Sequence, residues 1–262
     1  MMKSHFIRHF QRLCAAAVVS AALVPVAASA EPVTAVIELF TSQGCSSCPP
    51  ADQLLGELAE RPGVLALSMP VDYWDYLGWK DTFADHAYTE RQRGYAAARG
   101  DGQVYTPQVV VNGLEHAVGS RASEIDKAVA TSWSAVRNQA VAVSSRVEGD
   151  TVVIDVGASP AGVKAKPATV WVVHVLRHGE VAIKRGENSG LKVVYTNVVR
   201  KLTPVGAWTG QALSIKLAKA ELMATKSDGC AVLLQADGQG PMLGAAPIAN
   251  AEPQAVLALF RV

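Results

Sequence analysis

Two cysteines separated by two residues, Cys45 and Cys48, are the side chains of this sequence best suited to chemistry. They follow an apolar run at residues 35–40 and precede a helix-like segment, an arrangement typical of reversible disulfide chemistry. At the start of a helix, free backbone N–H groups and the positive end of the dipole would stabilise a thiolate, which is the reactive form of cysteine. The motif therefore predicts a redox-active pair.

Two other roles remain open for this pair. A structural bridge that closes so short a loop would contribute less than the roughly 3 kcal/mol of a 15-residue loop. A zinc site needs four ligands and only one such pair is present, whereas Cu(I) can bind two thiolates alone. His86 and His116 are candidate further ligands, although surface positions explain them more simply. Cys230 lies in an apolar, strand-like run, which predicts a buried and inert thiol.

The first 30 residues have the pattern of a cleaved secretory signal peptide. Lys3, Arg8 and Arg12 precede the apolar run at residues 13–27, and small residues follow at 28–30. The apolar run is shorter than the roughly 20 residues that cross a membrane. We therefore expect a secreted or periplasmic protein with no stable membrane insertion after cleavage.

The chain without this segment keeps 21 basic and 23 acidic residues, a formal charge of −2. No basic patch remains that would indicate nucleic-acid binding. Three cysteines also remain, and in an oxidising compartment this odd number suits one redox pair and one further thiol.

Residues 31–138 alternate between strand and helix patterns, which predicts an α/β domain. Strands are expected at Val33–Phe40, Val64–Met69, Gln108–Val111 and Leu114–Val118. Helices are expected from the cysteine pair to about Glu60, over Asp81–Arg99, and from Ser120 or Ser123 to about Arg137. The pair Asn112-Gly113 predicts a hairpin turn between the last two strands.

From residue 139 the pattern changes to short strands separated by Gly, Pro and Asp, without a convincing helix. This pattern is typical of an all-β sandwich. The expected strands are Val141–Val147, Thr151–Val156, Thr169–Arg177, Val181–Ile183, Lys192–Leu202, Ala212–Leu217 and Cys230–Gln235. The sequence thus predicts an α/β domain at 31–138 followed by a sandwich-like domain of unknown role at 139–262.

Two features outside the cysteine pair are candidates for a site. Glu38 interrupts the first buried strand, where a carboxylate needs a proton, a neighbouring N–H or a basic partner. The aromatic stretch at residues 73–79 lies among the acids Asp72, Asp75 and Asp81, so it either packs against the sheet or lines a groove. A solvated turn explains four polar residues of the second segment more simply than a site: Arg185, Glu187, Asn188 and Arg200.

Six segments of the sequence carry a family likeness, namely 38–52, 71–75, 78–81, 106–108, 186–188 and 197–200. Together they resemble the secreted thioredoxin-like proteins of the uncharacterised family DUF1223. The resemblance covers nearly all of the chain after the signal segment, and it is weak as to activity because the family has no well-established reaction. Pro70 stands where the family commonly has a histidine, so any role of that histidine is absent or moved.

The thioredoxin likeness implies a role for each matching residue. Cys45 would be the exposed attacking thiol and Cys48 the resolving thiol. Pro107 would be a cis-proline facing the pair, with the backbone of Thr106 holding an extended substrate segment. Glu38 lies, offset by one residue, near the buried acid that relays the proton of the resolving thiol in thioredoxins.

The leading hypothesis is a thiol–disulfide oxidoreductase that exchanges disulfides with protein thiols or a redox partner protein, without a cofactor. Its expected catalytic residues are Cys45, Cys48, Pro107 and Glu38, and its expected substrate-binding residues are Thr106, Tyr73, Trp74 and Asp72. Two alternatives remain, a protein that handles a soft metal such as copper and a non-catalytic binding module with a vestigial pair. The sequence predicts no dedicated metal site.

Overall fold

A computed structural model describes residues 32–223 and 227–248. The signal peptide expected at residues 1–30 lies outside the described residues. Within the described part of the chain, no helix is both long and apolar enough to cross a membrane. The architecture is mixed α/β, with one sheet of eight strands and a second sheet of three.

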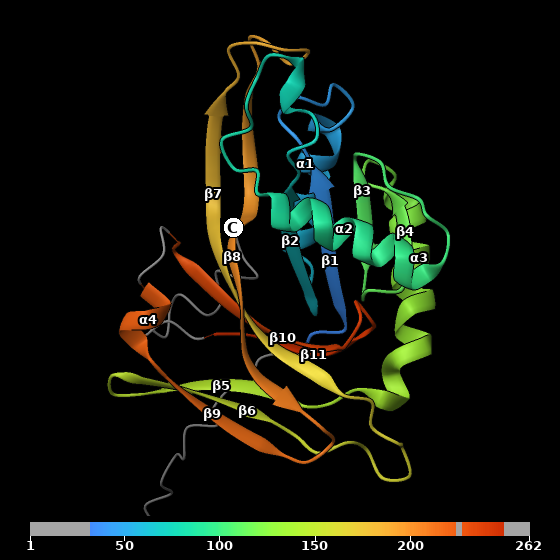
Figure 1. Ribbon diagram of the computed structural model, residues 1–262, viewed down its shortest axis with the longest axis vertical. Coiled ribbons are helices and arrows are strands. Elements are labelled where there is room, and N and C mark those ends of the chain that lie inside the picture. The colour runs from blue at the N-terminus through green and yellow to red at the C-terminus, as the bar shows by residue number, and fades with distance from the viewer. Residues whose placement is uncertain (1–31, 224–226, 249–262) are drawn as a thin grey trace, which may run out of the picture. The chain divides into compact units, whose positions relative to one another are not determined.

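The eight-stranded sheet has the order β11-β10-β7-β8-β2-β1-β3-β4 (Figure 1). From one edge to the other, its strands are β11 (Met242–Pro247), β10 (Gly229–Ala236), β7 (Ala168–Ala182), β8 (Lys192–Trp208), β2 (Val64–Pro70), β1 (Ala35–Thr41), β3 (Gln108–Val111) and β4 (Glu115–Val118). Strands from both halves of the chain therefore belong to one sheet.

The first half supplies four neighbouring strands and the three longest helices. β1 is parallel to β2 and antiparallel to β3, and β3 is antiparallel to β4. Helices α1 (Pro49–Ala59) and α3 (Ala122–Val136) pack on one face through a cluster that includes Ile37 and Leu39. Helix α2 (His86–Arg99) packs on the other face, in a cluster that includes Val36 and Phe40. Successive residues of β1 thus point to opposite layers.

The second half departs from the predicted separate sandwich. Only β5 (Val143–Glu148), β6 (Thr151–Val156) and β9 (Leu213–Ala218) form the three-stranded sheet, while β7, β8, β10 and β11 extend the sheet of the first half. The two sheets share an apolar cluster that includes Ile154, Val170 and Val232. The predicted change of pattern near residue 139 is real, but it marks no break in the large sheet. Whether either segment folds alone stays a prediction.

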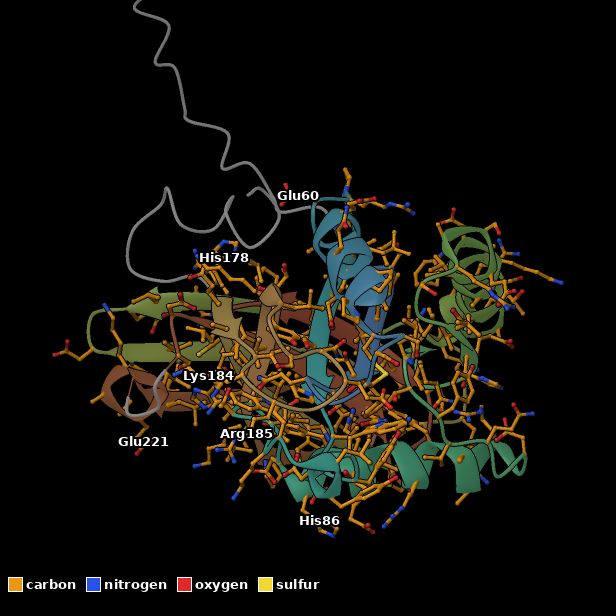
Figure 2. The ribbon with its side chains drawn as sticks, turned by 90° about the horizontal axis from the view of Figure 1, so that it is seen from above. Glu60, His86, His178, Lys184, Arg185 and Glu221 are labelled. Carbon is orange, nitrogen blue, oxygen red and sulfur yellow. A yellow bond between two sulfur atoms is a disulfide. The ribbon has the colours of Figure 1, made fainter. Side chains whose placement is uncertain are left out.

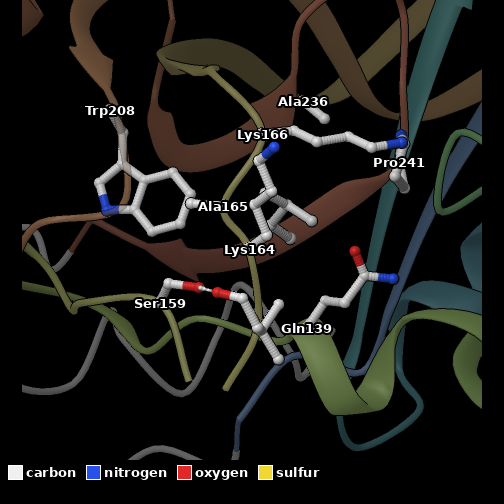
Figure 3. Close-up of a pocket in the computed structure, with 10 residues that line it drawn as sticks. Gln139, Ser159, Lys164, Ala165, Lys166, Trp208, Ala236 and Pro241 are labelled. Atoms are coloured by element: carbon white, nitrogen blue, oxygen red, sulfur yellow. Dashed lines mark hydrogen bonds between the residues drawn. The ribbon is translucent and has the colours of Figure 1, made fainter. Parts of the chain in front are cut away.

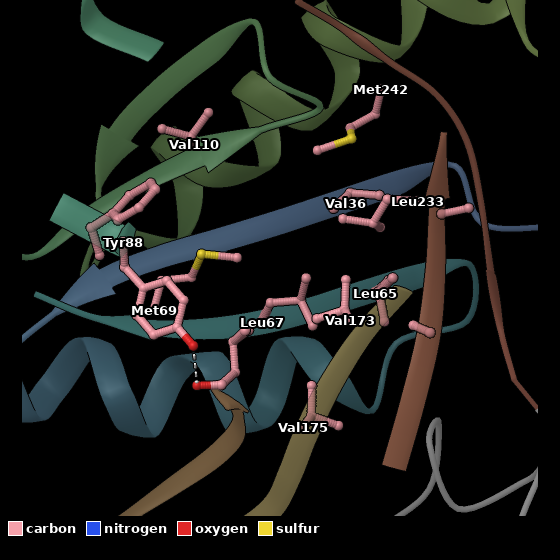
Figure 4. Packing of buried hydrophobic residues seen from close by; sticks show 14 of the residues in the cluster. Val36, Leu65, Leu67, Met69, Tyr88, Val110, Val173, Val175, Leu233 and Met242 are labelled. Carbon is pink, nitrogen blue, oxygen red and sulfur yellow. Dashed lines mark hydrogen bonds between the residues drawn. The ribbon is translucent and has the colours of Figure 1, made fainter. Parts of the chain in front are cut away.

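Hydrogen bonds reinforce the junction between the two halves. β2 pairs with β8 in parallel at Ser68 and Val198. The Tyr88 hydroxyl of α2 donates to the carbonyl of Val199 at 2.9 Å (Figure 4), and the Asn197 amide donates to the carbonyl of Ala66 at 3.0 Å. The segment at 197–200, one of those that carry the family resemblance, therefore has a structural role at this junction.

Several element boundaries differ from the sequence prediction. Helix α2 begins five residues later than expected, because the Asp85 side chain caps it by accepting from the N–H of Ala87 at 2.9 Å. The two short strands predicted around Arg177 are one long strand, β7. β11 and the short helix α4 (Lys219–Met223) were not predicted. The Asn112-Gly113 turn is confirmed, with positive φ at both residues.

Short 3₁₀ turns complete the chain at η1 (Asp75–Leu77) and η2 (Arg137–Gln139). Near η2 a cavity of about 10 Å³ lies beside Trp208 (Figure 3), and Ser159 donates a hydrogen bond across its edge to the carbonyl of Val163. That volume holds at most about one water molecule. The cavity is therefore a packing defect and no ligand site.

Candidate functional site

Cys45 and Cys48 form a disulfide at the start of α1, with their Cα atoms 5.4 Å apart (yellow bond in Figure 2). Cys48 is the N-cap residue of α1, and Pro49 and Pro50 are its first two residues. Neither proline has an N–H group, so the helix offers fewer free donors to a thiolate than the sequence argument assumed. The Ser47 hydroxyl lies 3.4 Å from the Cys45 sulfur and is a donor that can take their place.

Both cysteines are buried, with exposed fractions of 1% for Cys45 and 0% for Cys48. The expectation that Cys45 is exposed is therefore wrong in this disulfide form. The loop at residues 183–191, which joins β7 to β8, is bonded to the backbone of the cysteine loop in this buried arrangement. The buried Asn188 side chain donates to the carbonyls of Gln43 and Cys45 at 3.0 and 2.8 Å.

This contact also corrects the interpretation of the loop as a solvated turn. That interpretation fits Arg185, which is exposed (labelled in Figure 2), but not Asn188. Glu187 is exposed, yet its carboxylate accepts from the N–H of Ser46 at 3.2 Å. Sequence reasoning missed both contacts. The family resemblance at residues 186–188 was the signal that could have indicated them, because a solvated turn gives no reason for these residues to match the family.

The aromatic stretch at residues 73–79 contacts the cysteine loop through Trp74. Its indole N–H donates to the Thr106 hydroxyl at 2.8 Å, and its Cβ lies 3.1 Å from the position that a Cβ on Gly44 would occupy. The Thr106–Pro107 peptide bond is cis, as predicted. A Cβ on Gly119 would lie 3.1 Å from both Pro107 and Ala51 of α1. Trp74, Thr106 and Pro107 therefore lie around the start of α1.

Tyr73 and Asp72 are turned toward α2. The Tyr73 hydroxyl donates to the Gln92 side chain at 3.2 Å. The Asp72 carboxylate lies 2.9 Å from His86 Nδ1 and accepts from the Thr89 hydroxyl. Burial would raise the pKa of Asp72, but these two hydrogen bonds outweigh it and lower the pKa. Both side chains thus attach the segment at residues 72–73 to α2. Of the four predicted substrate-binding residues, only Trp74 and Thr106 lie near the cysteine pair.

Glu38 lies on the opposite face of β1 from the helix that carries the cysteines. Its fully buried carboxylate accepts from Arg91 Nε at 2.7 Å and from the Tyr95 hydroxyl. Arg91 also donates to Gln235 of β10 at 2.9 Å. Of the alternatives for Glu38, the structure supports a basic partner. No contact joins it to the cysteines that would support a proton relay.

A different buried acid lies beside the pair, namely Asp52, which is only 2% exposed. It lies one helical turn after Cys48, so the two side chains share a face of α1. Neither carboxylate oxygen makes a hydrogen bond of normal geometry. Burial raises the pKa of Asp52 well above its usual value, the nearby Thr41 hydroxyl opposes this in part, and the charge of Asp81 adds to it.

An open groove of about 470 Å³ runs between α1 and β8 next to this acid. Asp52 and Pro49 line it from α1, and Leu191 and Val194 line it with exposed apolar side chains. Water in the groove can reach the neighbourhood of Asp52. Sequence reasoning gave Asp52 no role of its own in the site and missed its burial.

The histidines considered as further metal ligands have other neighbours. His86 Nδ1 bonds to Asp72, and His116 Nδ1 lies 2.9 Å from the Tyr105 hydroxyl. Among the described residues, no group of three or more His, Cys, Asp or Glu side chains is placed to hold a metal ion.

Cys230 is a free, buried cysteine, and burial raises its pKa to about 11. We expect the oxidised, folded protein to incorporate less than about one tenth of an equivalent of iodoacetamide per Cys230 in an hour at pH 8, because so little thiolate is present. Mass spectrometry before and after unfolding in urea measures this. Labelling of the folded protein as rapid as that of the unfolded protein would contradict the prediction.

Comparison with known proteins identifies the family of this chain. Residues 36–235 match the family described as "Protein of unknown function (DUF1223)". The chain belongs to this family. A crystal structure of a structural-genomics protein from Agrobacterium tumefaciens has 38% identity and a TM-score of 0.74, covering 86% of this chain and 98% of that one. The DUF1223 resemblance drawn from the sequence is thus confirmed.

A second solved structure, HBP35 of Porphyromonas gingivalis, has 13% identity and a TM-score of 0.56, covering 86% of this chain and 78% of that one. At this identity the likeness concerns the fold alone. No curated protein matches this chain. The family and its relatives therefore supply no reaction, and a function has to be argued from the site.

Proposed function

We propose that this DUF1223 protein is an exported thiol–disulfide oxidoreductase whose residues 31–138 form a thioredoxin-like domain. The observation that carries the proposal is the cysteine pair at the start of α1 together with the cis Thr106–Pro107 bond nearby. The strand order β2-β1-β3-β4, with helices on both faces, supports the domain assignment. Its partners are protein thiols or disulfides, or a dedicated redox protein, outside the cytoplasm.

In the reducing direction, the Cys45 thiolate attacks one sulfur of a substrate disulfide and releases one substrate thiolate. The Cys48 thiolate then attacks the Cys45 sulfur, releases the second substrate thiolate and closes the Cys45–Cys48 disulfide. Two electrons pass from the protein to the substrate, and the reverse sequence oxidises a dithiol. Asp52 takes the place proposed for Glu38, since it can accept the Cys48 proton within the same buried layer.

The burial of Cys45 also favours a second candidate, a binding module in which the disulfide is structural. The test is the reduction potential of the pair, measured in glutathione buffers with thiol trapping. Catalytic pairs fall between about −120 and −270 mV, whereas structural bridges lie below about −300 mV. A value in the first range, with loss of exchange in Cys45→Ser, supports the oxidoreductase. A value in the second range, with slow trapping, supports the structural bridge.

The soft-metal alternative can be tested directly by measuring the metal content of the purified, reduced protein. Protein reduced and purified without chelator is expected to contain less than about one tenth of an equivalent of copper or zinc if the pair works by exchange. A stoichiometric metal that disappears in Cys45→Ser would contradict the exchange proposal.

A further inference from the structure

Hydrogen bonds within the loop at residues 183–191 hold its two ends together. Its base is held by hydrogen bonds from the N–H of Ile183 to the carbonyl of Leu191 at 2.9 Å and from the N–H of Gly190 to the carbonyl of Ile183 at 2.8 Å. The Ser189 hydroxyl donates to the carbonyl of Lys184 at 3.1 Å. The two backbone bonds at its base reduce the entropy cost of placing the loop's tip on a target.

The tip of the loop is bonded to the backbone of the cysteine loop. Asn188 donates one hydrogen bond on each side of Gly44, to the carbonyls of Gln43 and Cys45. Because this amide is 4% exposed, opening the loop would strip two buried carbonyls of a donor. Cys45 is 1% exposed in the same arrangement, so an attacking thiolate needs this part of the structure to open.

Glu187 adds a negative charge at the same place. Its carboxylate occupies the N–H of Ser46, the amide directly after Cys45. Other carboxylates lie around the loop: Asp52 on α1, Asp81, which accepts from the N–H of Gln43, and Asp75, which accepts from the N–H of Asp81. Among the described residues, no Lys, Arg or His side chain bonds to residues 43–48. This surrounding disfavours a Cys45 thiolate.

We propose that Asn188 and Glu187 are positioning residues of the redox pair. Asn188 holds the loop shut and limits the rate at which the disulfide is attacked. Glu187 disfavours the thiolate and shifts the equilibrium toward the disulfide. The second half of the chain thus selects for partners that can displace the loop. This inference rests on the proposed exchange function and specifies how access to that site is controlled.

The reaction to follow is reduction by dithiothreitol, which carries no charge. One of its thiolates attacks a cysteine sulfur, its second thiol closes a ring disulfide, and the two electrons and two protons it loses appear on Cys45 and Cys48. Thiol trapping with mass spectrometry counts the reduced pair at each time point.

Asn188→Ala is expected to speed this reduction roughly tenfold or more, because it removes both hydrogen bonds that hold the loop down. Ser189→Ala is the matched control, since it changes the neighbouring residue of the same loop and removes only the bond to Lys184. A rate for Asn188→Ala equal to that of Ser189→Ala and wild type, in folded protein, overturns the role of Asn188.

Glu187→Gln tests the charge without relying on a buried position. It keeps an oxygen acceptor for Ser46, and because Glu187 is exposed the variant should fold. We expect the glutathione equilibrium at pH 8.5 to shift roughly three- to tenfold toward the reduced form, the effect of one unit charge at short range in water. The iodoacetamide reaction profile of reduced Cys45 should shift to lower pH. Arg185→Gln, which changes charge in the same loop, is the control. It should shift neither the glutathione equilibrium toward the reduced form nor the iodoacetamide profile to lower pH.

The outcomes separate this inference from the proposed function. Exchange in wild type with no response to either variant overturns the inference and leaves the oxidoreductase standing. Slow exchange in wild type and rapid exchange in Asn188→Ala supports both. A disulfide that stays inert in wild type and in both folded variants overturns the inference and the oxidoreductase together.

Discussion

Replacing Arg91 with methionine is expected to lower the free energy of unfolding by about 3–5 kcal/mol, the usual cost of leaving a buried charge without its partner. Glu38 is fully buried and Arg91 is its only cationic contact in the described part of the chain. The substitution also removes donors to Gln235 and Tyr95, so β10 loses a bond to α2. Urea unfolding followed by circular dichroism measures the change.

Arg93→Met is the matched control, two residues along the same helix. Its guanidinium is half exposed and pairs with Glu90 at i,i+3, so its loss should cost less than about 1 kcal/mol. The double variant Glu38→Gln/Arg91→Met should recover part of the stability, because no charge is then left unpaired. A single Arg91→Met variant as stable as Arg93→Met would show that the Glu38 carboxylate gains another partner or a proton when Arg91 is removed.

Much of the first half of the fold could be predicted from the sequence. Its strands have continuous apolar patterns and its turns have specific chemistry, as at Asn112-Gly113, so local signals and the final structure agree. In the second half the strands were mostly found but their partners were not. The pairing of Val198 with Ser68 joins residues 130 positions apart, and no local pattern records which sheet a strand will enter.

The candidate site shows the same division. The cysteine pair and cis-Pro107 are local motifs, and the sequence locates them correctly. The backbone of Cys45 is bonded to a loop residue more than 140 positions away, and Asn188 in isolation has the character of a turn residue. The relay role expected of Glu38 is not supported for a related reason. Periodicity indicates that a strand residue is buried, but not which layer holds its partner, and Arg91 lies in the layer away from the cysteines.

Asp52→Asn is expected to stabilise the protein at pH 7 and to leave it nearly unchanged at pH 3. Because the folded-state pKa of Asp52 is raised, the stability it contributes is fully present below its unfolded pKa and is lost as pH rises through the folded value. Asparagine has the same shape and does not titrate. The gain at neutral pH should be roughly 1.4 kcal/mol for each unit by which the folded pKa exceeds the unfolded one. Urea unfolding across this pH range measures it.

Asp101→Asn is a control of opposite sign. Hydrogen bonding to Arg99 lowers the pKa of Asp101, so its contribution is present above the unfolded pKa and is lost as pH falls through the folded value. That variant should be less stable than wild type at pH 7 and similar near pH 2. An Asp52→Asn variant that loses stability at pH 7 would mean that the buried carboxylate has a partner that stabilises its charge.

The same substitution separates stability from exchange. An acid buried beside Cys48 at a cost to stability is the kind of compromise that functional sites retain. If Asp52 accepts the Cys48 proton, Asp52→Asn should be more stable and yet slower in closing the disulfide near neutral pH. The rate deficit should shrink at high pH, where the thiol ionises unaided. A variant that gains stability and exchanges at the wild-type rate would show that Asp52 does not accept the Cys48 proton. Water in the neighbouring groove would then be the candidate acceptor.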